Sequence, residues 1–201
     1  RREQQAQFLA MLTHELKTPL SIMKMGYTSP SQSDRTKKHI QTAIQDMTDV
    51  IDRCVMDDKL QNHEFQLKIQ ECNLNELIQD RINQYEDSSR IAFTAQAIYL
   101  IETDVQLLKI VIGNLVDNAL KYAEDQSLIE IRLSKSATSN QVELMIENQV
   151  GKNGFPDIEK IFDKYYRSPT AYEKTGSGLG LYLVKNFVQL VSGEIACKTR
   201  D

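Results

Sequence analysis

The chain has 201 residues, 41% of them hydrophobic, and a formal net charge of −4 at pH 7. This length and apolar content are enough to bury the core of one domain or of two small ones. The acidic balance, with no clustered basic face, argues against a nucleic-acid surface, because such a surface sets basic side chains against the phosphates. We therefore expect no nucleic-acid partner.

Two long segments with helical periodicity fill residues 1 to about 62, on either side of the turn sequence GYTSPSQSD at 26–34. They predict an antiparallel helical hairpin. Each segment carries one apolar stripe: Leu9, Leu12, Leu16, Leu20, Met23 and Tyr27 in the first, and Ile40, Ile44, Met47, Ile51 and Cys54 or Val55 in the second. Two such helices have too little apolar surface to close a core alone, so we expect two copies to form a homodimeric four-helix bundle.

The sequence FLAMLTHELKTPL at 8–20 places His14 on the polar face of the first helix, opposite the apolar stripe. A lone surface histidine usually has no chemical role. Here Glu15 can hydrogen-bond one imidazole nitrogen and raise the nucleophilicity of the other. Thr18, one turn further on, places a hydroxyl on the same face, within reach of a water near the ring. These neighbours favour a reactive histidine.

Residues from about 63 onward mix short strands with helices. Strand-like composition or alternation occurs at 91–102, 127–134, 141–148 and 193–199, and helical periodicity at 73–87, 104–123 and 179–193. Asp104 is a predicted N-cap and Gly193 a predicted C-cap. The pattern predicts a two-layer α/β sandwich with a mixed sheet.

The helix predicted at 104–123 carries Asn114, Asn118 and Lys121 at i, i+4 and i+7, which puts two amides and one cation on a single stripe. The ordinary interpretation of such residues is the solvated face of an amphipathic helix. Magnesium, however, takes hard oxygen ligands and keeps its waters and the substrate's phosphates. An amide oxygen beside an ammonium group is therefore also suited to a nucleotide site.

A glycine-rich sequence, TGSGLGLY at 175–182, comes directly before the last long helix. Its glycines allow backbone amides to approach a phosphate, and the helix start adds a favourable dipole. The G-x-G-x-G spacing is neither the Rossmann pattern nor a P-loop. The loop by itself is weak evidence.

Four sequences occur in the order found in two-component sensor histidine kinases. The string HELKTPL at 14–20 resembles the H-box of that family, NLVDNALKY at 114–122 its N-box, IFDKYYR at 161–167 its F-box and TGSGLGLY its G2 box. The resemblance covers nearly the whole chain, and it implies a histidine-phosphotransfer hairpin followed by a Bergerat-type ATPase domain.

The resemblance also implies roles for individual residues. His14 would be the phosphoacceptor, Glu15 would assist transfer, and Thr18 would position water when the phosphorylated partner is dephosphorylated. Asn118 would be the magnesium ligand, supported by Asn114. Residues 154–175 would be a mobile lid over ATP. The nucleotide-binding residues would be Asn114, Asn118, Lys121, Tyr122, Asn148, Gly151, Gly154, Tyr166, Arg167, Gly176, Ser177, Gly178, Leu179, Gly180 and Leu181.

The sequence departs from the family at the G1 box, where an aspartate that reads adenine and a G-x-G pair are expected. The corresponding sequence is IENQVGKNG at 146–154, so Asn148 aligns best, with Gly151 and Gly154 as displaced glycines. An amide oxygen still accepts a hydrogen bond but is a weaker acceptor than a carboxylate. Glu147 and Asp157 are the alternative carboxylates.

We therefore expect residues 1–62 to form a dimerisation and histidine-phosphotransfer hairpin and residues 63–201 a catalytic ATP-binding domain. With ATP and Mg²⁺ the chain would phosphorylate His14, pass the phosphoryl group to an aspartate of a response-regulator receiver domain, and also dephosphorylate that regulator. One alternative is a phosphatase-dominated or ATP-weak signalling scaffold. A second is a conformational ATPase of the gyrase, HSP90 and MutL type, in which a glutamate that activates water stands at the position of Asn114.

The cellular compartment is suggested by the cysteines and by hydropathy. Cys54, Cys72 and Cys197 are far apart and lack CxxC spacing, so neither a disulfide framework nor a zinc site is implied, and a reducing cytoplasm fits. No apolar run approaches the roughly 18 residues of a membrane span, and no signal peptide opens the chain. We expect the cytoplasmic part of an inner-membrane-anchored sensor, with the anchor outside these residues.

Overall fold

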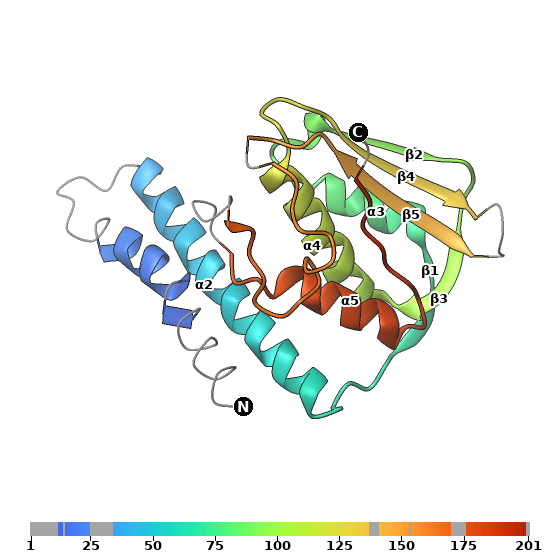
Figure 1. Cartoon of the computed structure of the whole chain (residues 1–201), viewed down its shortest axis with the longest axis horizontal. Coiled ribbons are helices and arrows are strands. Elements are labelled where there is room, and N and C mark those ends of the chain that lie inside the picture. Colours follow the sequence, from blue (N-terminus) through green and yellow to red (C-terminus); the bar gives the residue numbers. More distant parts are fainter. Residues whose placement is uncertain are drawn as a thin grey trace. The chain divides into compact units, whose positions relative to one another are not determined.

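A computed structural model describes residues 12–13, 15–24, 34–136, 141–152, 154–169 and 176–199. The chain divides into two compact units (Figure 1): residues 1–65 with 160–183, and residues 66–159 with 184–201. The segment 160–183 thus groups with the helices that precede residue 66. The division into functional domains at 62/63 remains a prediction.

The first unit contains the helices of the predicted hairpin. Residues 12–13 and 15–24 are helical, and α2 spans Asp34–Gln61, while the turn at 26–33 lies outside the described residues. The apolar positions of α2 fall into two stripes rather than one. Ala43 and Val50 are buried, whereas larger apolar side chains on the adjoining stripe are about half exposed: Ile44, Ile51 and Val55. A single chain leaves that second stripe uncovered.

The second unit contains two small sheets. β1 (Ile69–Asn73) pairs antiparallel with β3 (Leu100–Asp104). β2 (Ile91–Ala95) pairs in parallel with β4 (Ile129–Lys135), and β4 pairs antiparallel with β5 (Val142–Asn148). The predicted mixed sheet is confirmed in this three-stranded β2–β4–β5 sheet.

Helices α3 (Leu74–Ile82) and α4 (Val105–Tyr122) cover one face of the three-stranded sheet (Figure 1). Between them and the sheet lies one apolar core: Leu74, Leu77, Ile78, Ile82, Ile91, Ile112, Val116, Ala119, Ala123, Ile129, Ile131 and Leu133. Asp104 caps α4 as predicted, because its Oδ1 accepts hydrogen bonds from the N–H groups of Gln106 and Leu107 at 3.0 and 3.1 Å. The start of α4 is thereby fixed.

The strand predicted at 91–102 is two strands that belong to different sheets. The break is stabilised by Asn75 on α3, whose Nδ2 donates to the Ala97 carbonyl at 2.9 Å and whose Oδ1 accepts from the Tyr99 N–H at 2.9 Å. The side chain thus satisfies backbone groups that would otherwise continue a strand. β1 was not predicted, because its polar sequence IQECN lacks an alternating pattern.

Two further boundaries differ from prediction. The helix predicted at 73–87 ends at Ile82, and the short 3₁₀ helix Ser88–Arg90 follows. Residues 193–199 do not form a strand, although their burial alternates, because alternation predicts a half-buried face and not a pairing partner.

The last helix, α5, spans Gly180–Leu190, beginning in the first unit and ending in the second. At its end Ser192, one residue before the predicted C-cap Gly193, takes the left-handed conformation with φ of 60°. Gly193 instead donates its N–H to the Val188 carbonyl at 2.8 Å, as in a Schellman motif. No helix among the described residues is long and apolar enough to cross a membrane.

Candidate functional site

The amides predicted on α4 lie one turn apart with their orientations fixed by the helix itself. Asn114 is buried, and its Nδ2 donates to the Ile110 carbonyl at 2.9 Å. Asn118 repeats this bond to the Asn114 carbonyl, also at 2.9 Å. Because each amide nitrogen is held by the backbone, the oxygen of Asn118 is the atom available to a cation. Lys121 and Tyr122 end the helix, with the Lys121 Nζ 5.1 Å from the Tyr122 ring centroid.

The chain that follows β5 lies against this end of α4. Ala123 and Val150 form an isolated antiparallel bridge, the Gly151 N–H donates to the Tyr122 carbonyl at 3.1 Å, and the Glu124 N–H donates to the Gln149 carbonyl at 3.0 Å. A Cβ at Gly151 would lie 2.9 Å from the Ala123 oxygen, so this close approach requires glycine. The structure therefore brings the N-box residues beside the segment that replaces the G1 box.

Strand register separates Asn148 from the alternative Glu147. Directly opposed residues of an antiparallel pair share a face of the sheet. Asn148 is opposite Ile129, which is fully buried, whereas Glu147 is opposite Glu130. Asn148 therefore lies on the helix-covered face. Glu147 lies on the other face, where it forms an ion pair with Arg132.

The remaining contacts also favour Asn148 as the residue facing a nucleotide. Its Nδ2 donates to the Gln149 carbonyl at 3.0 Å, which leaves the Oδ1 as the acceptor that it presents. The other alternative, Asp157, is exposed and accepts a hydrogen bond from the Glu159 N–H at 3.2 Å. Gly154 is exposed with φ of +69°, and a Cβ there would meet nothing within 4 Å.

In the first unit, the glycine loop lies directly on the F-box segment. The Tyr165 N–H donates to the Gly178 carbonyl at 3.0 Å. Gly178 has φ of +68°, and a Cβ there would lie 2.6 Å from the Tyr165 carbonyl carbon and 2.8 Å from the Tyr166 oxygen. Both the backbone conformation and the lack of space exclude other residues.

The two residues that flank Gly178, Ser177 and Leu179, are buried. The Ser177 Oγ accepts from the Leu179 N–H at 3.3 Å. Gly180 begins α5, and four predicted site residues here are half-buried: Gly176, Gly178, Gly180 and Leu181. The loop therefore has the short, glycine-lined shape that was expected before a helix start.

The predicted phosphoacceptor, His14, lies outside the described residues. Its neighbour Glu15 is described, and the Glu15 Oε1 lies 3.8 Å from the Arg167 Nη1. Thr18 is exposed, as predicted. Tyr166, next to Arg167, donates its N–H to the Asp163 carbonyl at 3.2 Å. Residues assigned from sequence to two different motifs, Glu15 and Arg167, thus lie within ion-pair distance.

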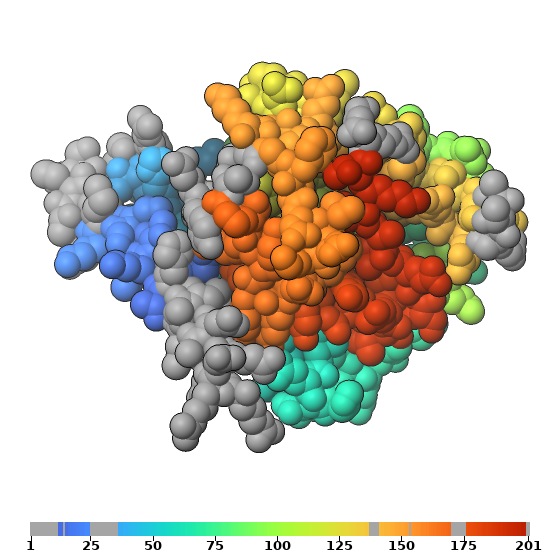
Figure 2. Space-filling view, in the orientation of Figure 1, coloured from blue at the N-terminus to red at the C-terminus, as the bar shows by residue number. Residues whose placement is uncertain are grey.

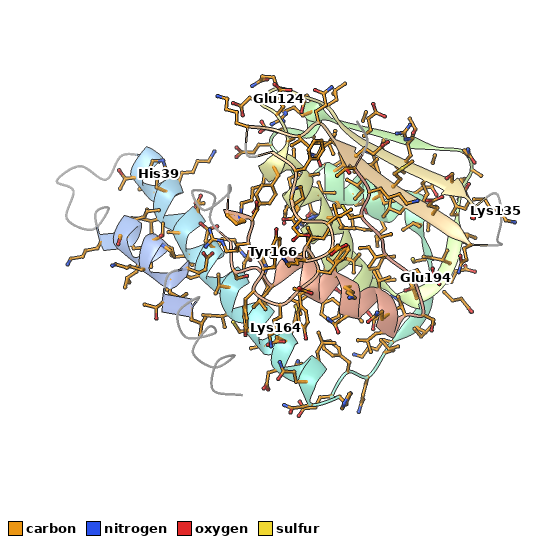
Figure 3. All side chains as sticks on the ribbon, in the orientation of Figure 1. His39, Glu124, Lys135, Lys164, Tyr166 and Glu194 are labelled. Carbon is orange, nitrogen blue, oxygen red and sulfur yellow. The ribbon has the colours of Figure 1, made fainter. Side chains whose placement is uncertain are left out.

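Sequence reasoning missed a second ion pair in this unit, between Lys164 and Asp57. The Lys164 Nζ lies 2.6 Å from the Asp57 Oδ2, and the Asp57 side chain is only 8% exposed. Figure 3 shows Lys164 beside α2. A sequence signal existed, because Asp57 continues the seven-residue spacing of the buried Ala43 and Val50. A charged residue on a buried stripe indicates a partner.

A magnesium ion at this site would take single oxygen donors rather than a preformed cage. Among the described residues, no three His, Cys, Asp or Glu side chains are grouped to hold an ion. The Asn118 oxygen fits magnesium, which is commonly held by one or two protein oxygens together with substrate phosphates.

Comparison with known proteins agrees with this arrangement. Residues 103–201 match the family described as histidine kinase-, DNA gyrase B- and HSP90-like ATPases. The sensor protein kinase WalK of Staphylococcus epidermidis is 26% identical over 94% of this chain, and the chain spans 33% of that protein.

Solved structures share the fold. Acinetobacter baumannii histidine kinase AdeS matches 88% of this chain and 86% of its own with a TM-score of 0.66 at 16% identity. Histidine kinase ThkA in complex with response regulator TrrA matches 100% of this chain and 60% of its own, with a TM-score of 0.62 at 21% identity. The sequence matches support a two-component histidine kinase catalytic core, and the solved structures share its fold.

Proposed function

We propose that this chain transfers the γ-phosphoryl group of ATP to His14 and then to an aspartate of a response-regulator receiver domain. The observation that carries the proposal is the end of α4, where Asn114, Asn118 and Lys121 lie beside the backbone-paired segment 148–151. The family match of residues 103–201 and the regulator-bound relative ThkA support it.

The transfer forms one bond and breaks one bond in each step. A nitrogen of His14 bonds to the γ-phosphorus while the bond to the bridging oxygen of ADP breaks, and Glu15 takes the proton of the other imidazole nitrogen. The receiver aspartate then bonds to phosphorus as the phosphorus–nitrogen bond breaks. Asn118 would hold Mg²⁺, which supplies charge neutralisation at the phosphates, and Lys121 would add to it.

Two further properties belong to the proposal. Thr18 has no nucleophilic role, and its exposed hydroxyl would orient the water that removes phosphate from the regulator. A homodimer would cover the uncovered α2 stripe, where Ile44 and Ile51 are each 51% exposed. Leu20 of the first helix, 58% exposed, would add to the same interface.

Asn148 favours a second candidate, the signalling scaffold that binds ATP weakly, because a neutral amide replaces the expected carboxylate. The conformational ATPase is disfavoured by Asn114. An amide cannot act as the base that activates water, and the Asn114 nitrogen is held by the Ile110 carbonyl. Calorimetric titration with Mg-ATP separates the scaffold from a working kinase.

The test is incubation with γ-labelled ATP and Mg²⁺, which should produce acid-labile, base-stable label on the protein. His14→Gln should abolish the label, whereas His39→Gln and His63→Gln, at the exposed histidines, should keep it. Labelling of His14→Gln at the parent's rate would overturn the assignment. When a phosphorylated response regulator is added, Thr18→Ala should slow its dephosphorylation while leaving autophosphorylation of the chain intact.

A further inference from the structure

A buried charge cluster joins α2 to the F-box segment in the first unit. Asp57 lies on the buried stripe of α2, where the Lys164 Nζ approaches its Oδ2 to 2.6 Å. The Gln61 Nε2 donates to both carboxylate oxygens, at 3.1 and 3.3 Å. The carboxylate therefore has a cation and an amide as partners in place of water.

Two tyrosines complete the surroundings of the Lys164 ammonium. It lies 5.2 Å from the ring centroid of Tyr165 and 5.5 Å from that of Tyr182. Burial, followed by the charge of Asp57, raises the pKa of Tyr165 to about 12. Burial and Asp57 also raise the pKa of Tyr182. The Lys164 cation offsets the negative charge of Asp57 in this partly buried site.

The cluster is connected by backbone to the glycine loop. Tyr165, next to Lys164, donates its N–H to the carbonyl of Gly178, and Tyr182 lies in the first turn of α5, two residues after Gly180. Three residues beyond Lys164, Arg167 approaches Glu15 to 3.8 Å. Residues 164–167 thus contact α2, the glycine loop and Glu15, the neighbour of His14.

We propose that Lys164 and Asp57 are a positioning pair for phosphoryl transfer, which holds the segment of Arg167 on α2, so that Arg167 stays beside Glu15, the neighbour of His14. The inference rests on the proposed function. The geometry gives its reason: the Asp57 carboxylate is buried and pairs with Lys164 at 2.6 Å, and displacing the cation would leave a buried charge unpaired.

ATP binding and phosphoryl transfer can be measured separately, and the pair is expected to act on the transfer step. The amides of α4 and the segment 148–151 belong to the second unit, whereas Lys164 and Asp57 both belong to the first. The glycine loop is in the first unit too, but its own contact, the Tyr165 N–H to the Gly178 carbonyl, is a backbone bond that neither side chain of the pair makes. We therefore expect loss of the pair to slow transfer from bound ATP far more than it weakens ATP binding.

The experiment compares Asp57→Asn and Lys164→Met with the parent. Each variant is assayed for ATP affinity by calorimetry and for the single-turnover rate of His14 labelling, after circular dichroism has confirmed that it is folded. Asp58→Asn and Lys185→Met are matched controls at exposed positions of α2 and α5. Lys164→Arg retains the charge.

We expect Asp57→Asn and Lys164→Met each to lower the labelling rate at least about ten-fold, which corresponds to about 1.4 kcal/mol or more in the activation free energy of transfer. Each should change the ATP dissociation constant less than about three-fold. Lys164→Arg should recover at least a third of the parent's rate, and both controls should match the parent. Amide hydrogen exchange of residues 160–169 should be faster in Asp57→Asn and Lys164→Met, and unchanged in the two controls.

An active parent whose variants label at an unchanged or higher rate would overturn the positioning role and leave the proposed function intact. A lower labelling rate that is fully explained by weaker ATP binding would also overturn the positioning role and leave the proposed function intact. A parent that binds ATP but takes no label would instead overturn the proposed function, and this inference with it.

Discussion

The two units place their polar side chains by different physical means. In the second unit, the amides of α4 are positioned by a helix whose other side is buried in an apolar core. In the first unit, residues 164–167 are joined to the helices by ion pairs and to the glycine loop by the close approach of Gly178. Apolar burial is specified by local periodicity, whereas an ion pair joins residues that no local pattern connects. This difference decides which parts of the site can be read from sequence.

The α4 region illustrates the first case. Ile112, Val116 and Ala119 are buried against sheet residues such as Ile129 and Ile131, each fully buried. Helical spacing from these apolar positions fixes the phase of α4, and with it the stripe of Asn114 and Asn118.

The F-box segment illustrates the second case. On the face shown in Figure 2, residues 154–169, drawn in orange, lie at the surface, and most of their side chains are exposed or half-buried. Their sequence gives no apolar stripe that would seat them. Lys164 and Arg167 reach Asp57 and Glu15, which lie far away in the sequence.

The largest loss of ATP affinity is expected when Gly178, which lies against the Tyr165 backbone, is replaced. Gly178→Ala places a Cβ 2.6 Å from the Tyr165 backbone at a φ of +68°, so the loop must leave its seat at a cost of about 3–5 kcal/mol. ATP affinity, measured by calorimetry, should fall at least about 30-fold.

Gly154→Ala, at another predicted nucleotide-binding glycine, is the comparison that isolates the backbone strain from the steric approach. Its φ of +69° carries the same conformational strain, about 1–2 kcal/mol, but a Cβ there meets nothing within 4 Å. A loss of ATP affinity as large as that of Gly178→Ala would show that strain alone is responsible, and not the approach to Tyr165.

An intermediate effect is expected at Asp104, which links β1 to α4. Its Oδ2 accepts from the Lys68 N–H at 2.9 Å, and its Oδ1 caps α4. Asp104→Ala should lower the free energy of unfolding by about 2–3 kcal/mol in urea titrations at pH 7, because it removes a cap and leaves a backbone donor unpaired. Asp80→Asn, at an exposed position of α3, should change it little.

The same carboxyl predicts a pH dependence. Burial alone would raise the pKa of Asp104, but hydrogen bonds from the Lys68, Leu107 and Gln106 N–H groups hold it below the ordinary 3.8. A lowered folded-state pKa gives stability that is present above the unfolded pKa and is lost as pH falls through the folded value. The difference between parent and Asp104→Ala should therefore shrink below about pH 4. A difference that stayed constant to pH 2 would contradict the charge contribution.

The site divides in the same way between what the sequence predicts and what it does not. Asp104 as N-cap, the α4 stripe and the mixed sheet follow from local patterns, and all three are present. The break at 96–99 depends on the Asn75 side chain, which is distant in sequence. The pairing of Lys164 with Asp57 depends on tertiary contact in the same way, so only the unusual place of a charge on a buried stripe of α2 hinted at it.

The smallest effect concerns Asn148, where the chain departs from its family. If the Asn148 Oδ1 reads the adenine amino group, a neutral acceptor should cost about 1–2 kcal/mol relative to a carboxylate, roughly ten-fold in affinity. Asn148→Asp should then keep or tighten ATP binding, and Asn148→Ala should weaken it further.

Glu147→Gln provides the control, because the register places Glu147 on the opposite face of the sheet with Arg132. Calorimetric titration of ATP and GTP into the parent and the three variants distinguishes the outcomes. The amide nitrogen of Asn148 is held by the Gln149 carbonyl at 3.0 Å. Guanine has a carbonyl where adenine has its amino group, so GTP binds well only if this bond breaks and the amide turns its nitrogen outward. We therefore expect a preference for ATP that Asn148→Ala reduces. Unchanged ATP affinity in Asn148→Ala, with a loss in Glu147→Gln, would move adenine recognition to the carboxylate and contradict the register argument.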